Sequence, residues 1–294
     1  MIAAEFDYVA PESLDEALQA LRDGGEDAKL LAGGHSLIPL MKLRLAAPTL
    51  LVDLRKVPGL SGIQRDERSG DEGSARGTGA WRIGPMTTHT EMTGAGLGLM
   101  SAVASTIADP QVRNRGTLGG SLAHGDPASD QPAIMLITEA TMTVRGAGGR
   151  REVAAAEFFH DYLTTAVGEG EVLTEIRVPA LEGHAYGYRK FNRRQEDWAM
   201  VAASALVKRA PDGTCEDVRV GLTHMASTPL RATAVEEALR GRPLDAESIA
   251  AAAEHAAEGT DPPADLNASE DYKRHLARVL TRRALEDAAG GTSS

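Results

Sequence analysis

Two glycine pairs, each followed by small polar residues, are the parts of this sequence most able to do chemistry. The first lies in "LLAGGHSL" at residues 30–37, and the second lies in "TLGGSLAH" at residues 117–124. Glycine tolerates positive φ and lets another group approach the backbone closely. A Gly-Gly turn before a helix can therefore direct several amide N–H groups at one anion.

Two such turns facing each other would hold a pyrophosphate from both sides, with the hydroxyls of Ser36, Thr117 and Ser121 as further donors. Neither turn is a Rossmann fingerprint, because the first lacks the third glycine of GxGxxG and has no acidic residue at the usual offset. No Gly-Lys-Ser/Thr of a P-loop occurs either. Judged by these residues alone, two ordinary strand-to-helix turns remain as plausible as a nucleotide site.

The elements around the first turn alternate between helix and strand. "PESLDEALQALRDGG" has a capping box at Ser13 and Glu16 and one apolar face, which predicts a helix. "AKLLAG" is typical of a short buried strand, Ser36 is a plausible N-cap for a helix in "SLIPLMKLRLAAP", and "TLLVDL" predicts another buried strand. This order is typical of an α/β unit.

The order of the predicted elements changes near residue 184. Three predicted strands, "AYGYRKF", "AMVAASALVKRA" and "CEDVRVGLTHM", are followed by three predicted helices, which indicates a separate α+β domain. We therefore expect an N-terminal domain over 1–179, divided near residue 57 into subdomains 1–57 and 58–179, and a C-terminal domain over 180–288. The polar, Gly-rich residues 65–80 are expected to form an exposed, mobile hairpin loop, and residues 289–294 a disordered tail.

Composition excludes several classes of function. The 294 residues carry a formal net charge of −11, which disfavours binding to nucleic acid or to an anionic membrane. No apolar run approaches the ~20 residues of a membrane span, and the acidic N-terminus is unlike a signal peptide, so a cytoplasmic protein is expected. Cys215 is the single cysteine, so this chain alone cannot hold an iron–sulfur cluster or a Cys-rich zinc site.

Four longer stretches together resemble one protein family. "LLAGGHSLIPLMKLRLAAPTLLVDL" and "RNRGTLGGSLAHGDPASDQPA" resemble the two FAD-binding segments of the medium subunits of molybdenum hydroxylases. "YRKFNRRQEDWAMVAA" and "SEDYKRHLARVLTRRAL" resemble the start and the last helix of that family's C-terminal domain. The family includes the aerobic carbon monoxide dehydrogenase medium subunit and the FAD domain of xanthine dehydrogenase. The resemblance covers nearly the whole chain in the right order.

The resemblance implies an α+β fold. A two-subdomain α/β FAD-binding module of the vanillyl-alcohol oxidase/p-cresol methylhydroxylase type would precede a C-terminal domain of a three-stranded sheet with helices. FAD would lie extended, with its pyrophosphate between the two loops. Asp130 would lie near the adenosine ribose and Lys190 near the flavin ring. The remaining cofactor-binding residues carried over from the family are Ala32, Gly33, Gly34, His35 and Ser36 of the first loop, and Thr117, Gly119, Gly120 and Ser121 of the second.

The resemblance also implies partners. A large subunit would hold the molybdenum cofactor, and a small subunit would hold the iron–sulfur clusters. This chain would be an oxidoreductase component without a catalytic acid or base of its own. It would pass electrons through FAD to NAD, a quinone or oxygen. The alternatives are a stand-alone flavin oxidase or dehydrogenase, and a nucleotide-sensing or scaffold protein that keeps the fold without flavin chemistry.

Several single features admit two interpretations. His124, Asp126 and Asp130 form H-x-D-x-x-x-D, yet their place beside the second turn favours polar groups facing a cofactor over a metal site. Trp198 is expected in the core under the sheet rather than against a flavin. "RKFNRR" fits either a partner subunit or the cofactor's negative charge.

Two further expectations concern packing. A β-branched residue at Gly119 is expected to weaken FAD retention, because it would crowd the anion-binding turn and resist positive φ. The last predicted helix should bury an apolar stripe, formed by Tyr272, Leu276, Val279 and Leu280.

Overall fold

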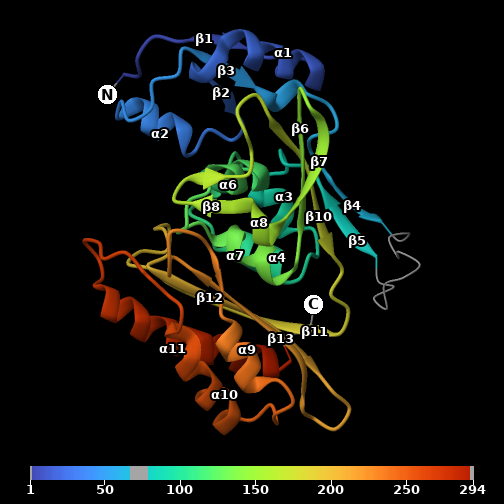
Figure 1. Cartoon of the computed structure of the whole chain (residues 1–294), viewed down its shortest axis with the longest axis vertical. Coiled ribbons are helices and arrows are strands. Elements are labelled where there is room, and N and C mark those ends of the chain that lie inside the picture. The colour runs from blue at the N-terminus through green and yellow to red at the C-terminus, as the bar shows by residue number, and fades with distance from the viewer. Residues whose placement is uncertain (1, 67–78, 292–294) are drawn as a thin grey trace.

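The computed structural model describes residues 2–66 and 79–291 as three bodies stacked in chain order (Figure 1). The first is built on a three-stranded sheet, the second on a five-stranded sheet, and the third on a four-stranded sheet. A two-stranded ribbon is attached to the second body. The predicted mixture of helices and sheets is confirmed, with helices interleaved among the strands of the first two bodies.

The first body is a small parallel α/β unit with strand order β1-β3-β2. Ser13 caps its first helix by accepting a hydrogen bond from the Glu16 amide, while the Glu16 carboxylate accepts one from the Glu12 amide. Ala17, Leu18 and Leu21 form the helix face that packs on the sheet. The elements are β1 (Asp7–Val9), α1 (Leu14–Gly24), β2 (Ala28–Leu31), α2 (Leu37–Lys42) and β3 (Leu50–Asp53).

The second body has an antiparallel sheet of order β4-β5-β10-β6-β7 covered by short helices. A helix that ends at Ser105 is followed by a separate turn of helix that begins at Pro110. The elements are β4 (Ile63–Asp66), β5 (Ala80–Ile83), α3 (His89–Thr93), α4 (Leu99–Ser105), α5 (Pro110–Arg113), α6 (Leu118–His124), α7 (Asp130–Ile137), β6 (Thr141–Gly146), β7 (Gly149–Ala154), α8 (Ala155–Phe158), β8 (Phe159–Asp161), β9 (Thr164–Thr165) and β10 (Val172–Pro179).

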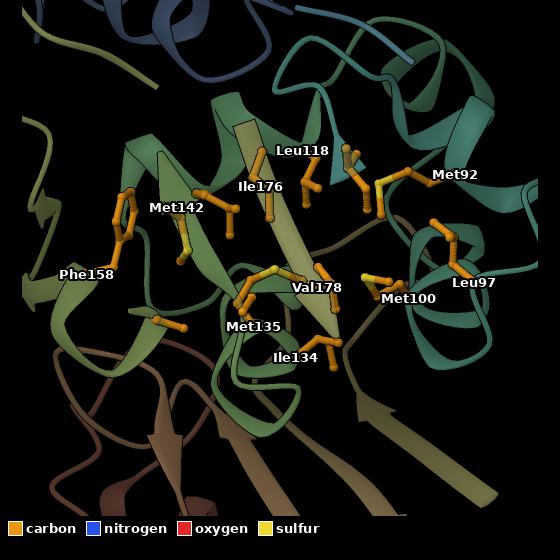
Figure 2. Packing of buried hydrophobic residues seen from close by; sticks show 14 of the residues in the cluster. Met92, Leu97, Met100, Leu118, Ile134, Met135, Met142, Phe158, Ile176 and Val178 are labelled. Carbon is orange, nitrogen blue, oxygen red and sulfur yellow. The ribbon is translucent and has the colours of Figure 1, made fainter. Parts of the chain in front are cut away.

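The largest core fills the space between this sheet and its helices. Met142, Ile176 and Val178 project from β6 and β10 toward Ile134 and Met135 of α7 (Figure 2). Leucine, valine and alanine make up most of the rest of the cluster, as the low aromatic content requires. Leu118, at the start of α6, is fully buried here, so the second glycine turn is anchored directly in this core.

The third body carries one antiparallel sheet of order β11-β12-β13-β14, with its helices on one side (Figure 1). The three expected strands are present, and a two-residue strand, β14, adds a short edge. The elements are β11 (His184–Phe191), β12 (Val201–Arg209), β13 (Cys215–Thr223), β14 (Leu230–Arg231), α9 (Thr233–Leu239), α10 (Ala246–Ala253) and α11 (Glu270–Ala289).

Helix α11 buries a different stripe from the expected one. Leu276 and Leu280 are buried as predicted, but Tyr272 is 43% exposed and Val279 is only half-buried. The first residue on the buried face is Lys273, whose ammonium donates to Asp265 at 2.7 Å. Apolar spacing alone could not find this position, because a partner carboxylate is what allows a lysine to be buried.

Parts of two expectations lie outside the described residues. Strands β4 and β5 form the antiparallel pair expected on either side of the polar loop, but residues 67–78 of that loop are not among those described. Helix α11 continues through Ala289, and residues 292–294 of the expected tail are likewise outside the description. The domain limits near 57 and 180 stay predictions. Across the described ranges, every helix is too short or too polar to cross a membrane.

The contact between α11 and β11 gives a stability prediction. A Cβ on Gly187 would collide with the backbone carbonyl of Ala284, whereas a Cβ on Gly148 would meet no atom within 4 Å. Gly187→Ala should lower the free energy of unfolding by about 1–3 kcal/mol through overpacking. Gly148→Ala, the matched control, should leave it unchanged or raise it by less than ~1 kcal/mol. Chemical denaturation of both variants checks this, and equal midpoints would contradict it.

Candidate functional site

All eleven residues predicted to bind a cofactor line one cavity of about 530 Å³. Its walls come from all three bodies, because Lys190 and Trp198 belong to the third body and the two glycine turns belong to the first and second. The eleven residues are Ala32, Gly33, Gly34, His35, Ser36, Thr117, Gly119, Gly120, Ser121, Asp130 and Lys190.

The two loops touch each other. A Cβ on Gly33 would run into the carbonyl oxygen of Arg115 and would lie 2.8 Å from the Cα of Gly116. A Cβ on Gly120 would lie 3.5 Å from the Cβ of Ala32. Gly33 does not have positive φ, so close approach, rather than backbone conformation, requires glycine there. The segment before each helix thus forms one side of a shared cleft.

The first loop presents unused donors. Gly34 has φ of +79°, and the amides of Gly33, Gly34, His35 and Ser36 donate to no acceptor in the described part of the chain. The Ser36 hydroxyl does not cap α2, although its position is that of the N-cap. Consecutive free amides around a left-handed residue form the concave donor arrangement that binds anions. The first loop thus has the donor arrangement expected of an anion-binding turn, and its role as a binding site stays a prediction.

The second loop does not repeat this arrangement, and the expectation of two facing amide clusters is wrong in this half. The amides of residues 118–121 are already bonded, because Thr117 accepts two of them and the neighbouring segment 85–89 accepts the other two. The bonds are Leu118 N–H to Thr87 O at 2.9 Å, Gly119 N–H to Pro85 O at 2.8 Å, Gly120 N–H to Thr117 Oγ1 at 3.1 Å and Ser121 N–H to Thr117 O at 3.0 Å. This loop supplies a wall rather than an amide cradle.

Gly119 is needed for a different reason from the one expected. It lies inside α6 and lacks positive φ, so a side chain would not be strained by the backbone. A Cβ there would instead collide with Pro85, 2.7 Å from its Cα. A larger residue at Gly119 would therefore push segment 85–89 away from the second loop.

Asp130 and Lys190 form a buried ion pair in the cavity wall. The Lys190 ammonium donates to Asp130 Oδ2 at 2.9 Å, and the Tyr188 hydroxyl donates to Asp130 Oδ1 at 2.7 Å. Burial raises the pKa of the Asp130 carboxyl, while Lys190 and Tyr188 oppose that rise. Burial and the Asp130 charge raise the pKa of Tyr188 well above its ordinary value, so its hydroxyl stays a donor.

The contact between these two side chains limits the roles taken from the family resemblance. Asp130 was expected near the adenosine ribose and Lys190 near the flavin ring, which lie at opposite ends of an extended FAD. Two groups 2.9 Å apart serve the same end of such a ligand, so both assignments cannot hold together.

The H-x-D-x-x-x-D residues have separate partners. Asp126 accepts a hydrogen bond from the Ala128 amide, Asp130 pairs with Lys190, and His124 lines the cavity. Burial lowers the pKa of the His124 imidazole. Among the described residues, no group of three His, Cys, Asp or Glu side chains is arranged to hold a metal.

Trp198 is not a core residue, contrary to expectation. It is 54% exposed and lies at the cavity together with Glu196 and Asp197. The error has a simple cause, since residues 192–200 form a loop between β11 and β12 rather than part of either strand. Of the basic run before it, Arg189 pairs with Asp287 and Arg193 with Asp197.

Segment 85–89 is a part of the cavity wall that no sequence motif indicated. Segment 85–89 runs along the second loop, and Pro85, Met86 and His89 line the cavity. Ile107, Ala108 and Val112 add an apolar surface. The Thr-rich run "PMTTH" reads as a turn into a helix, and a histidine at a helix start gives no signal of burial.

The fold is an α+β module whose three bodies enclose one cavity lined by all eleven candidate residues. Residues 4–181 match the family described as "FAD binding domain in molybdopterin dehydrogenase", and residues 186–288 match "CO dehydrogenase flavoprotein C-terminal domain". The chain belongs to this family of FAD-binding molybdopterin dehydrogenase subunits. The predicted family and its oxidoreductase class are confirmed.

Full-length relatives agree with this assignment. The chain is 42% identical to the carbon monoxide dehydrogenase medium chain of Hydrogenophaga pseudoflava, with 98% of each chain covered. It is 35% identical to the 6-hydroxypseudooxynicotine dehydrogenase complex subunit alpha of Paenarthrobacter nicotinovorans, with 96% of this chain and 94% of that protein covered. These names refer to different substrates, so the similarity establishes the family and not a substrate.

Solved structures give the same result. A chain of carbon monoxide dehydrogenase from Hydrogenophaga pseudoflava superposes with a TM-score of 0.90 at 42% identity, with 99% of each chain covered. A chain of quinoline 2-oxidoreductase from Pseudomonas putida 86 gives a TM-score of 0.89 at 34% identity, again over 99% of each chain.

The buried ion pair gives a prediction about stability. Lys190→Met leaves the Asp130 carboxylate buried without its counter-ion, which should cost about 3–5 kcal/mol of unfolding free energy. The double variant Asp130→Asn/Lys190→Met should recover most of that loss. The loss in the single variant should shrink as the pH is lowered, since burial raises the pKa of Asp130 and the protonated carboxyl needs no counter-ion. Chemical denaturation of the cofactor-free wild type and of both variants, at several pH values, measures these free energies of unfolding. A double variant that is less stable than Lys190→Met would contradict the pairing.

Proposed function

We propose that this chain is the FAD-carrying medium subunit of a molybdenum hydroxylase complex, with FAD held in the cavity between the two glycine loops. The observation that carries the proposal is the free amide cluster of residues 33–36, facing the second loop across that cavity. The family membership supports it. In this role the chain receives electrons from iron–sulfur clusters on a small partner and delivers them to an external acceptor.

The residues present fit FAD. A pyrophosphate carries negative charge, and four free amides with the Ser36 hydroxyl supply donors for it without a charged side chain. The cavity volume, about 530 Å³, is within the range of about 300–1,000 Å³ that is usual for small-molecule sites. Leu37, Leu40, Ile107 and Val112 provide apolar wall for ring systems.

We assign Asp130, Lys190 and Trp198 to the flavin end. The resemblance places Lys190 at the flavin ring, and its ion pair with Asp130 then brings that carboxylate to the same end. FAD, when bound, supplies an electron carrier that both one- and two-electron partners can use. Lys190 would place a positive charge beside it, and Asp130 with Tyr188 holds the ammonium in place. The exposed Trp198 lies at the rim of this end.

The partners and the acceptor belong to the same proposal. Relatives are named as medium chains or as one subunit of a complex, which supports a large molybdenum-cofactor subunit and a small iron–sulfur subunit. A single cysteine, buried in β13, is consistent with clusters on another chain. We propose NAD, a quinone or oxygen as the class of acceptor.

Measurements of FAD binding test whether the cofactor lies in this cavity. The purified chain should show a flavin absorption spectrum, and Gly33→Ala should raise the FAD dissociation constant at least about tenfold, because its Cβ forces the two loops apart. Gly148→Ala, which adds the same methyl group in open space, should bind FAD like the wild type. Equal FAD affinity for all three proteins would place the cofactor elsewhere.

Co-purification tests the complex. Affinity purification of the tagged full-length chain from its own cells should bring down a large and a small subunit, and metal analysis should find molybdenum and iron in them. Under anaerobic conditions, the organic substrate of the complex should bleach the flavin in the complex but not in the isolated chain. Bleaching of the isolated chain would favour the stand-alone oxidase or dehydrogenase.

A further inference from the structure

His89 is a buried polar residue in the cavity wall that the family motifs do not include. It is the first residue of α3 and is 4% exposed. Its Nδ1 atom is enclosed without any hydrogen-bond partner, and the side chain lines the cavity. The other ring nitrogen, Nε2, makes no hydrogen bond with a described residue and is not among the enclosed atoms, so it is the nitrogen that a ligand can reach. A buried imidazole without a partner for this nitrogen is costly unless a ligand supplies one.

The backbone fixes this imidazole against the second loop. The His89 amide donates to the Gly116 carbonyl at 3.0 Å, and the Leu118 amide donates to the Thr87 carbonyl at 2.9 Å. A Cβ on Gly116 would lie only 3.0 Å from His89 Cδ2 and 3.3 Å from Nε2. The ring is therefore held in place before any ligand binds.

The charge state of His89 selects the kind of group that it can contact. Burial lowers its pKa to about 4, with smaller contributions from the charges of Arg113 and His35. The ring is consequently neutral near pH 7 and has one donor and one acceptor nitrogen. This suits a neutral polar group, such as a purine edge or a ribose hydroxyl, better than it suits a phosphate.

His89 and Lys190 contact different parts of the cavity wall. His89 lies against Gly116, Gly120 follows against Ala32, the Ser121 and Ser129 hydroxyls are 2.5 Å apart, and Asp130 contacts Lys190. The first loop lies on the His89 side, because Gly33 packs on Arg115 and on Gly116, the residue against which His89 lies. These contacts come from the close approaches at the glycines and from the side-chain hydrogen bonds.

We propose that His89 is a binding residue for the adenosine half of FAD, contacting the purine or its ribose through the imidazole. This inference rests on the proposed function, which puts the flavin ring at Lys190 and therefore the adenosine at the other end. Ile107, Ala108 and Val112 supply the apolar surface against which a purine would lie.

ADP is the probe, because it contains the adenosine and the pyrophosphate but no flavin. Calorimetric titration of the cofactor-free full-length chain with FAD and with ADP should show both affinities falling about tenfold in His89→Phe, as expected for one lost buried hydrogen bond. His89→Gln, whose amide nitrogen can replace Nε2, should recover most of the affinity. If His89→Phe does not fold, His89→Asn, whose amide is too short to reach the cavity, should show the same loss.

His184→Gln is the matched control, since His184 also has a buried, unpartnered Nδ1 but does not line the cavity. It should bind FAD and ADP like the wild type. Unchanged ADP affinity in the His89 variants would overturn the inference, whether or not FAD binding falls. If His184→Gln also lost ADP affinity, general destabilisation of the fold would explain the loss in the His89 variants, and the inference would fail. Failure of the wild type to bind FAD would instead refute the proposed function.

Discussion

The close approach of two glycine loops, one from each of the first two bodies, is the constraint on which the site depends. Gly33 packs on the Arg115–Gly116 backbone with no room for a side chain, and Gly120 lies beside Ala32. This contact brings the free amides of the first loop to the wall formed by the second. Two rigid supports hold it, because β2 ends immediately before the first loop and Leu118 anchors the second in the main core.

The two loops are similar in sequence but differ in the hydrogen bonding of their backbone amides. In the first, a left-handed Gly34 and an unused Ser36 leave four amides free to bind an anion. In the second, a threonine N-cap and the neighbouring segment 85–89 accept the amides of residues 118–121. The difference comes from tertiary contacts, since the accepting carbonyls of Pro85 and Thr87 are far away in sequence. The third body then completes the site by contributing Lys190 and the Trp198 loop.

Much of this was predictable from sequence. Regular periodicity and caps indicated α1, the strands around the first loop and the order of strands and helices in the third body. Family resemblance gathered all eleven site residues, which line one cavity. The failures have physical causes. Local pattern could not reveal that the second loop's amides are bonded, that Asp130 pairs with Lys190, or that Trp198 is exposed, because each depends on a partner distant in the chain. The buried Lys273 and His89 escaped notice because polar residues give no signal of burial.

The central claim is that the diphosphate of one FAD rests on the amides of residues 33–36, with the flavin ring at Lys190. A crystal structure of the FAD-loaded chain tests it most directly. Pyrophosphate oxygens should lie within about 3.2 Å of at least two of these amide nitrogens, with the isoalloxazine ring beside Lys190. A cofactor whose pyrophosphate makes no contact with this loop, or whose adenine lies beside Lys190, would contradict the account.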